Sequence, residues 1–274
     1  MPEVHARYSI KQLTELDEFR ALVDLQRTFG EIEPKYILPA RNFAAVVDKG
    51  GATLGLFDES NSLRGFISHF PGRYQDEVVG WSFRLVIDPA LRGKGLEKTL
   101  KLKQKEIALK KGLNKLYWTV DHLHISSSFR SLRLEGTSCN TYLHNFYERA
   151  TMISRHILEP DCLLVKWDLH HNETNPAFDE DRDTYVPALI YRDNTILNEP
   201  PRLSLNTDKP FVQITIPGAE VLLRKLGESA LKQWRALSKE AFIYYFDNGY
   251  VVCSMMINDE KNPSEATYFL EREK

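Results

Sequence analysis

The chain has 274 residues, of which 42% are hydrophobic and 27% are charged, and its formal net charge is −2. This composition is typical of a soluble globular protein with one large domain or two small ones. A charge this close to zero gives no electrostatic reason to expect nucleic acid or an anionic membrane as a partner. The sequence also shows no apolar run near the ~20 residues that span a bilayer and no signal-peptide core.

The cysteines and histidines argue against a metal site. Cys139, Cys162 and Cys253 are odd in number and widely spaced, which fits neither a disulfide framework nor a zinc pattern. We therefore expect no metal and a reducing, cytoplasmic environment. The adjacent pair His170 and His171 falls at an expected strand end, where a solvated loop is preferred to a metal site.

The first part of the chain predicts alternating strands and helices. A helical stripe runs from Leu16 to Phe29, and a second, shorter helix is expected at 40–49. Pro71 and Gly72 are expected to close a hairpin. Apolar runs bounded by turn residues predict strands at 8–13, 52–57, 63–70 and 78–87.

The stretch from 83 to 112 organises the rest of the chain. The apolar run 85–87 predicts a buried strand, which Asp88-Pro89 ends because proline has no N–H for the ladder. The basic turn Arg92-Gly93-Lys94-Gly95 follows, and a helix is expected from about Leu96 to Gly112. This geometry points unpaired N–H groups at a phosphate. An ordinary α/β connection remains the alternative.

The remainder predicts a second strand–helix assembly. A strand is expected at 116–121 and a helix at 129–135, and the polar stretch 172–183 is expected to be a linker. We therefore predict one domain at 1–171 and an α+β extension at 184–274. The extension is expected to hold strands at 186–191, 211–216, 250–257 and 266–270 and a helix at 219–246, with core positions at Val221, Leu222, Leu226, Leu231, Trp234 and Phe242.

The order strand, RGKG turn, helix, strand resembles the GNAT superfamily of acyl-CoA-dependent N-acyltransferases. Other stretches, among them GLFDESNSLRGFISHFPG at 55–72 and GLNKLYWTVD at 112–121, are similar to a branch of long predicted GNAT acetyltransferases with an extra C-terminal segment. The resemblance implies an α/β fold with a mixed, mostly antiparallel sheet flanked by helices, followed by a smaller α+β lobe.

The resemblance also implies an activity and a set of site residues. A small amine, such as an amino acid or a related metabolite, attacks the thioester of acetyl-CoA or another acyl-CoA directly. Ser82 and Asp161 are candidates for holding the substrate. An ordinary strand role is the alternative for Ser82, and Asp161 is also a second candidate for the proton acceptor. The cosubstrate would be bound by Leu85, Val86, Ile87, Arg92, Gly93, Lys94, Gly95, Leu96, Ser127 and Ser131.

The candidate proton-transfer groups have two interpretations each. Asp121 ends a strand at the expected cleft and is the best carboxylate base, but it equally suits a capping or turn role. Tyr142 and Tyr147 are candidate donors for the leaving thiolate, with aromatic packing as the alternative. The oligomeric state stays open.

Several positions depart from the pattern of the family. Glu97 stands where Gly or Ala is usual, Phe83 where His is frequent, and Cys162 where Arg is typical. Ser127 and Ser131 replace Asn. These changes motivate the alternative of a GNAT-fold protein without ordinary acetyl transfer, acting as a binding or regulatory module or in other thioester chemistry.

Overall fold

The computed structural model describes residues 7–29, 34–144, 146, 162–171, 185–190, 201–260 and 263–273. These residues belong to two compact units that divide the chain between Trp118 and Thr119, with Asp168–His170 returning to the first unit. The predicted domain boundaries at 171 and 184 remain a prediction, and the predicted linker at 172–183 lies outside the described residues.

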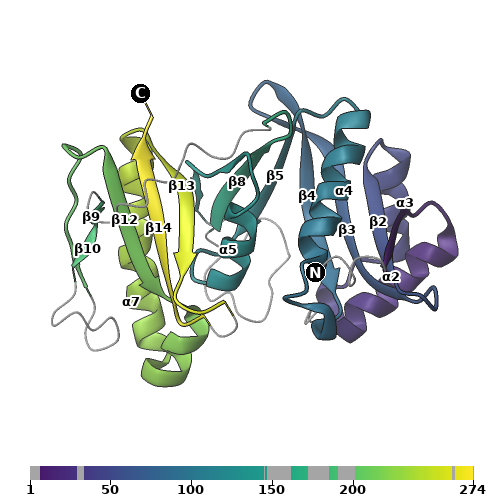
Figure 1. The fold of residues 1–274 in the computed structure, drawn as a ribbon, viewed down its shortest axis with the longest axis horizontal. Coiled ribbons are helices and arrows are strands. Elements are labelled where there is room, and N and C mark those ends of the chain that lie inside the picture. The colour runs from purple at the N-terminus through teal and green to yellow at the C-terminus, as the bar shows by residue number, and fades with distance from the viewer. Residues whose placement is uncertain are drawn as a thin grey trace. The chain divides into compact units, whose positions relative to one another are not determined.

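The first unit is built on a mixed sheet (Figure 1). Four strands run antiparallel in chain order, and β5 then joins β4 in parallel, as predicted for a mostly antiparallel sheet. The strands are β1 (Ser9–Gln12), β2 (Ala52–Phe57), β3 (Leu63–Tyr74), β4 (Glu77–Ile87) and β5 (Lys115–Val120), and the helices are α2 (Leu16–Phe29), α3 (Ala40–Asp48) and α4 (Leu96–Lys110).

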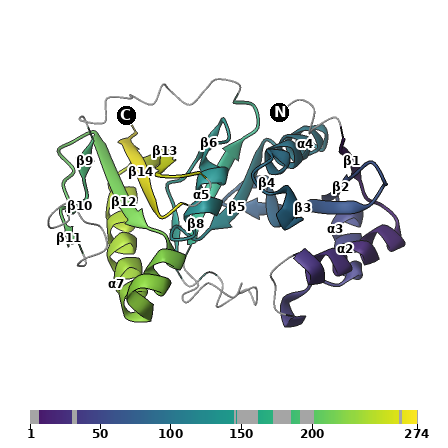
Figure 2. The same ribbon diagram turned by 60° about the horizontal axis from the view of Figure 1, so that its bottom comes forward.

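Both faces of this sheet are covered, which explains why β2 is buried along its whole length. Figure 2 shows α2 and α3 on one face and α4 on the other. Phe43 and Phe66 pack edge-to-face at 5.4 Å in the core under α2 and α3. Ile67 and Leu100 belong to the core under α4. Successive strand residues thus feed opposite cores, as the two-residue period of a strand requires.

The end of β3 differs from the prediction. Pro71 and Gly72 do not close the hairpin, because β3 continues to Tyr74 and the turn falls at Gln75, which has φ 52°. Pairing with β2 ends at His69, so beyond that residue β3 pairs, among the described strands, with β4 alone. A proline is tolerated at such an edge, where its missing N–H costs no ladder bond.

The junction of β4 and β5 depends on a glycine and a bulge. Gly80 pairs with Leu116, and a Cβ on Gly80 would lie 2.3 Å from a methyl carbon of that leucine. Parallel pairing covers two residue pairs and ends at Trp81 with Tyr117. One step further, the β3–β4 register shifts so that Phe83 is the extra residue of a β-bulge. From Ser82 onward β4 is therefore not paired with β5.

The second unit contains short strands, a four-stranded sheet and one long helix. Its sheet has the order β13-β14-β12-β9, and α7 runs along it in Figure 1. Strands β6 and β7 pair with β8, and β10 pairs with β11. The elements are α5 (Ile125–Leu132), β6 (Thr137–Ser138), β7 (Tyr142–Leu143), β8 (Cys162–Asp168), β9 (Val186–Pro187), β10 (Leu189–Ile190), β11 (Arg202–Leu203), β12 (Phe211–Pro217), α7 (Ala219–Asp247), β13 (Tyr250–Ile257) and β14 (Glu265–Arg272).

Two predictions in the second unit are wrong in detail. The helix expected at 129–135 is α5 and begins four residues earlier, because Ile125, Ser128 and Leu132 form its buried face despite the low helix propensity of serine. Leu226, predicted to be core, is 43% exposed. It precedes Gly227, whose φ of 82° interrupts α7 and ends the periodicity on which that prediction rested. The remaining five predicted core positions are buried.

Candidate active site

The turn between β4 and α4 is held in place by the contacts of Asp88 at its start. Asp88 follows the last residue of β4, and its Oδ1 accepts a hydrogen bond of 2.9 Å from the N–H of Ala90. Its other carboxylate oxygen pairs with the guanidinium of Arg64 on β3, and its own N–H donates to the carbonyl of Arg64 at 2.8 Å. Because Asp88 is 4% exposed, this pair anchors the start of the turn inside the protein.

The turn itself is exposed and has the backbone geometry expected of an anion site. Gly93 and Gly95 have φ of 74° and 80°, in the left-handed region that side chains rarely adopt. Gly95 directly precedes the first residue of α4, whose first amide N–H groups have no partner within the helix. A Cβ on Gly93 would meet no atom within 4 Å. The positive end of the helix dipole therefore faces open space beside Arg92 and Lys94.

The end of β4 leads into this turn, and one side of its backbone is not paired with β5. The side chain of Val86 lies in the core under α2 and α3, and that of Ile87 in the core under α4. Leu85 is 38% exposed, which is unusual for a leucine in the interior of a strand. Since β4 is unpaired with β5 here, these residues would contact a ligand through their N–H and C=O groups.

The elements of the first unit have a characteristic order. Antiparallel strands end in the bulged strand β4, and a turn with left-handed glycines, a helix and a parallel strand follow. The first unit has the GNAT fold. The fold predicted from the sequence resemblance is thus confirmed, and the RGKG turn occupies the position between β4 and α4 that the resemblance implied.

No family model and no curated protein matches the chain. Among solved structures, it is similar to a putative GNAT acetyltransferase from Desulfovibrio desulfuricans, with 14% identity over 59% of this chain and 99% of the other and a TM-score of 0.46. An alanine N-acetyltransferase of a ribosomal protein from Escherichia coli has 16% identity, coverages of 62% and 99%, and a TM-score of 0.44. An aminoglycoside acetyltransferase from an uncultured soil sample has 15% identity, coverages of 46% and 85%, and a TM-score of 0.40. Such likeness does not extend to a substrate.

The GNAT unit also contains a buried polar cluster that sequence reasoning missed. Lys101 Nζ donates to Ser82 Oγ at 3.2 Å and lies 3.7 Å from the centre of the Trp118 ring. Gln104 contacts the same hydroxyl through both amide atoms, at 3.1 and 3.3 Å, and its Nε2 lies 3.4 Å from Nδ1 of His69. The sequence did contain a sign of this cluster. Lys101 and Gln104 lie on the same helical face as the buried Leu100, so their helical spacing places them toward the core.

Burial perturbs both titratable groups of this cluster. It lowers the pKa of the Lys101 amine from 10.5 to about 7. Burial, together with the positive charges of Lys111 and Lys101, lowers the pKa of His69 to about 4. Both shifts arise because a charged group loses its hydration in the interior. His69 is therefore neutral at neutral pH, and Lys101 is divided between its amine and ammonium forms.

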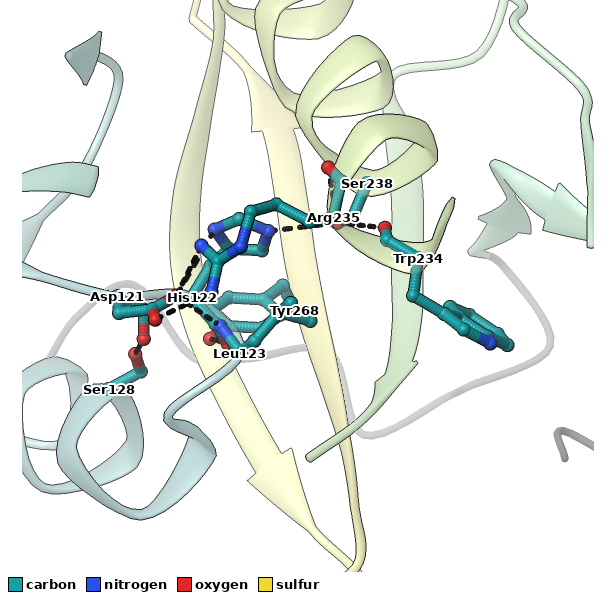
Figure 3. Close-up of polar contacts among 8 residues, drawn as sticks. All are labelled: Asp121, His122, Leu123, Ser128, Trp234, Arg235, Ser238 and Tyr268. Atoms are coloured by element: carbon teal, nitrogen blue, oxygen red, sulfur yellow. Dashed lines mark hydrogen bonds and ion pairs between the residues drawn. The ribbon is translucent and has the colours of Figure 1, made fainter. Parts of the chain in front are cut away.

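Asp121, the predicted base, lies in the second unit and is held in a buried ion pair (Figure 3). Its Oδ1 and Oδ2 accept from Nη1 and Nη2 of Arg235 at 3.0 and 2.8 Å, and Oδ1 also accepts from the N–H of Leu123 at 3.0 Å. Burial raises the pKa of Asp121, but the hydrogen bonds and charge of Arg235 outweigh burial and leave the pKa below its ordinary value. This is the geometry of the turn interpretation, with both oxygens already engaged.

His122 and Ser238 make the same region resemble a nucleophilic triad. Ser238 Oγ lies 2.8 Å from Nε2 of His122, whose Nδ1 is 3.8 Å from Oδ1 of Asp121 (Figure 3). Three observations oppose that chemistry. Ser238 and His122 are both 0% exposed, the 3.8 Å contact exceeds a hydrogen bond, and Ser238 Oγ donates to the carbonyl of Trp234 at 2.6 Å. The network instead joins α7 to the end of β5, with Tyr268 donating to the carbonyl of His122 at 2.6 Å.

The other predicted site residues are distributed as follows. Tyr142 is half-buried, with its ring 5.6 Å from that of His122 and 6.4 Å from that of Phe242, as the packing alternative predicts. Ser127 and Ser131 are half-buried on α5 in the second unit. Tyr147 and Asp161 lie outside the described residues.

The environments of the three cysteines oppose a reactive thiol. Burial raises the pKa of Cys139 to about 12 and that of Cys253 to about 12, and Cys162 is 0% exposed. A thiolate is the reactive form of cysteine, so these shifts oppose nucleophilic catalysis. Within the described ranges, no three His, Cys, Asp or Glu side chains lie close enough to hold a metal ion. None of the helices described here has the length and apolarity needed to cross a membrane.

Proposed function

We propose that the protein is an acyl-CoA-dependent N-acyltransferase that binds the pyrophosphate of CoA at residues 92–96. The observation that carries the proposal is the exposed turn with two left-handed glycines at the start of α4. It follows the end of β4, which pairs with β3 but not with β5. Backbone N–H groups at a helix start bind phosphate without any side chain. Arg92 and Lys94 add positive charge beside the same turn.

The chemical step follows from the unpaired edge of β4. An acyl-pantetheine chain that continues from the turn along 85–87 would meet backbone N–H and C=O groups, and an N–H there would stabilise the oxyanion of the thioester. A neutral amine then attacks the thioester carbon directly. The acceptor we propose is a small amine, such as an amino acid or a related metabolite, and the cosubstrate is acetyl-CoA or another acyl-CoA.

A second candidate is a GNAT-fold protein that binds a CoA-like molecule without transferring an acyl group. Two observations favour it. Glu97 places a carboxylate in the first turn of α4, and Asp121 is engaged by Arg235 through both oxygens. A negative charge beside a helix start opposes a phosphate there as much as it stabilises the helix.

Ligand-dependent stabilisation separates these candidates. Melting curves of the full chain are recorded with acetyl-CoA and with longer acyl-CoAs, and a ligand at 100 times its Kd should add about 2.7 kcal/mol of stability. Release of free thiol is then followed with and without a panel of amines. Stabilisation with amine-dependent thiol release supports the transferase, and stabilisation without release supports the binding protein. No stabilisation by any acyl-CoA contradicts both.

A further inference from the structure

Lys101 is an unusual lysine because it is buried and has no carboxylate partner among the residues that the structure describes. Its side chain enters the GNAT unit from α4, and the residue is 8% exposed. Within the described ranges, no Asp or Glu oxygen lies within ion-pair distance of its Nζ, which instead contacts Ser82 Oγ and the ring of Trp118. Burying an amine in this way costs free energy, and such groups concentrate at sites that use them.

The amine lies where the β4 edge opens. Ser82, its hydrogen-bond partner, is the first residue of β4 beyond the last β4–β5 pair, Trp81 with Tyr117. The bulge at Phe83 follows at once. In the proposed function the pantetheine chain runs back along β4 from the turn after Ile87, so its acyl end approaches Ser82. The hydroxyl therefore stands between that end and the Lys101 amine.

The surroundings of Lys101 keep both of its protonation states accessible. Burial favours the neutral amine, whereas the face of the Trp118 ring favours the ammonium. On β3, His69 is neutral above pH ~4, and its Nε2 contacts no hydrogen-bond donor or acceptor among the described residues. Gln104 on α4 is uncharged, and the charge of Lys111, the residue that follows α4, acts on His69. No partner described here fixes Lys101 in the charged form.

We propose that Lys101 is the proton acceptor of the acyl transfer and works through the hydroxyl of Ser82. The proposal rests on the function proposed above and adds to it the route of the proton. Ser82, which the sequence suggested as a substrate-binding residue, would contact the attacking amine, and Lys101 would act behind it. Gln104 would position the Ser82 hydroxyl between them.

The proton balance closes without another reactant. The nitrogen of the neutral acceptor amine forms a bond to the thioester carbon, and its proton passes to Ser82 Oγ as the hydroxyl proton passes to Lys101 Nζ. The carbon–sulfur bond then breaks, and the electron pair leaves with the sulfur. The Lys101 ammonium returns the proton through Ser82 to the thiolate, so the products are an amide and free CoA thiol and Lys101 is neutral again.

The pH profile of kcat/KM tests this role. Only the neutral amine accepts a proton, so the wild-type rate should rise with pH through a limb near 7, which is the pKa of Lys101. Lys101→Arg keeps a donor to Ser82 and a cation over Trp118 but cannot deprotonate. It should lose the limb and ~100-fold or more in kcat, with KM for acyl-CoA little changed. If the Lys101→Arg variant kept both the wild-type rate and the rise of kcat/KM near pH 7, the proposal would be wrong.

Further variants guard against misfolding and against failure of the underlying function. Lys101→Met removes the free-energy cost of burying an amine, so its melting temperature should be no lower than that of wild type. It should nevertheless lose the rise of kcat/KM near pH 7. Ser82→Ala should lower kcat and Ser82→Thr should restore it. Lys110→Met, on the exposed side of α4, should match wild type. If acyl-CoA neither binds nor reacts in wild type, the proposed function itself fails. If it reacts with an unchanged limb in Lys101→Met, the Lys101 proposal alone fails.

Discussion

Glu97 is the residue at which stability of the protein and binding of CoA compete. Its carboxylate lies in the first turn of α4, where it stabilises the helix dipole and repels an anion. We expect Glu97→Gln to bind acyl-CoA several-fold more tightly and to lose up to about 1 kcal/mol of unfolding free energy. Titration calorimetry and urea denaturation measure the two effects. Glu59→Gln, in an exposed turn, serves as the control, and unchanged affinity in Glu97→Gln would place the phosphate elsewhere.

Asp121 and Arg235 make a second residue-scale prediction, about stability. Removing one partner of a buried pair leaves an uncompensated charge, so Arg235→Met should cost about 3–5 kcal/mol in urea denaturation. The side chain of Asp121 is 6% exposed and that of Arg235 is 1% exposed. Arg133→Met breaks an exposed pair with Glu260, 58% and 68% exposed, and should cost under about 1 kcal/mol. Similar losses in the two variants would contradict a structural role for Asp121.

At the scale of elements, the two glycines on either side of α4 provide a matched comparison. Gly93 precedes the helix and Gly112 follows it, with φ of 74° and 77°, and a Cβ on either would meet nothing within 4 Å. Alanine at either position should therefore cost about 1 kcal/mol through the left-handed backbone alone. Only Gly93→Ala should also weaken acyl-CoA binding, because it reshapes the turn that presents the N–H groups. Equal affinities for the two variants would show that the turn does not bind CoA.

Most helices and strands could be predicted from the sequence. A local pattern of apolar residues is enough where the buried residues recur with the period of a helix or a strand. The strands at 52–57 and 250–257 and the start of α4 at Leu96 fall where the sequence placed them. The misses have tertiary causes. Pro71 lies within β3 because no described strand pairs with that side of β3 beyond His69. Helix α5 begins at Ile125 because its buried face outweighs the weak helix propensity of serine.

For the whole molecule, His69 predicts how stability depends on pH. Its pKa is about 4 in the folded protein against 6.5 when exposed, so the unfolded chain binds more protons between these values. The loss of stability due to His69 should be absent above pH 6.5 and should reach about 3 kcal/mol as the pH drops to 4. This window lies below that of Lys101, which spans pH 7 to 10.5.

Urea denaturation at pH 7, 5.5 and 4 measures this loss. His69→Gln should remove most of the acid-dependent decrease, because an uncharged side chain then occupies the buried position. His170→Gln is the control, since His170 is exposed and contacts Asn114 through its Nε2 at 2.8 Å. A full decrease in His69→Gln would assign the acid sensitivity to other groups.

The sequence by itself determined the order of the strands and helices and the turn after β4, because strand period, Pro89 and the glycines of the RGKG turn act locally. The tertiary structure alone decided what the polar side chains do. Asp121 meets Arg235 across 114 residues, and Lys101 meets Ser82 and Trp118 from separate elements. Burial and partners, which set whether a carboxylate is engaged or an amine is neutral, depend on long-range packing that residue spacing does not encode.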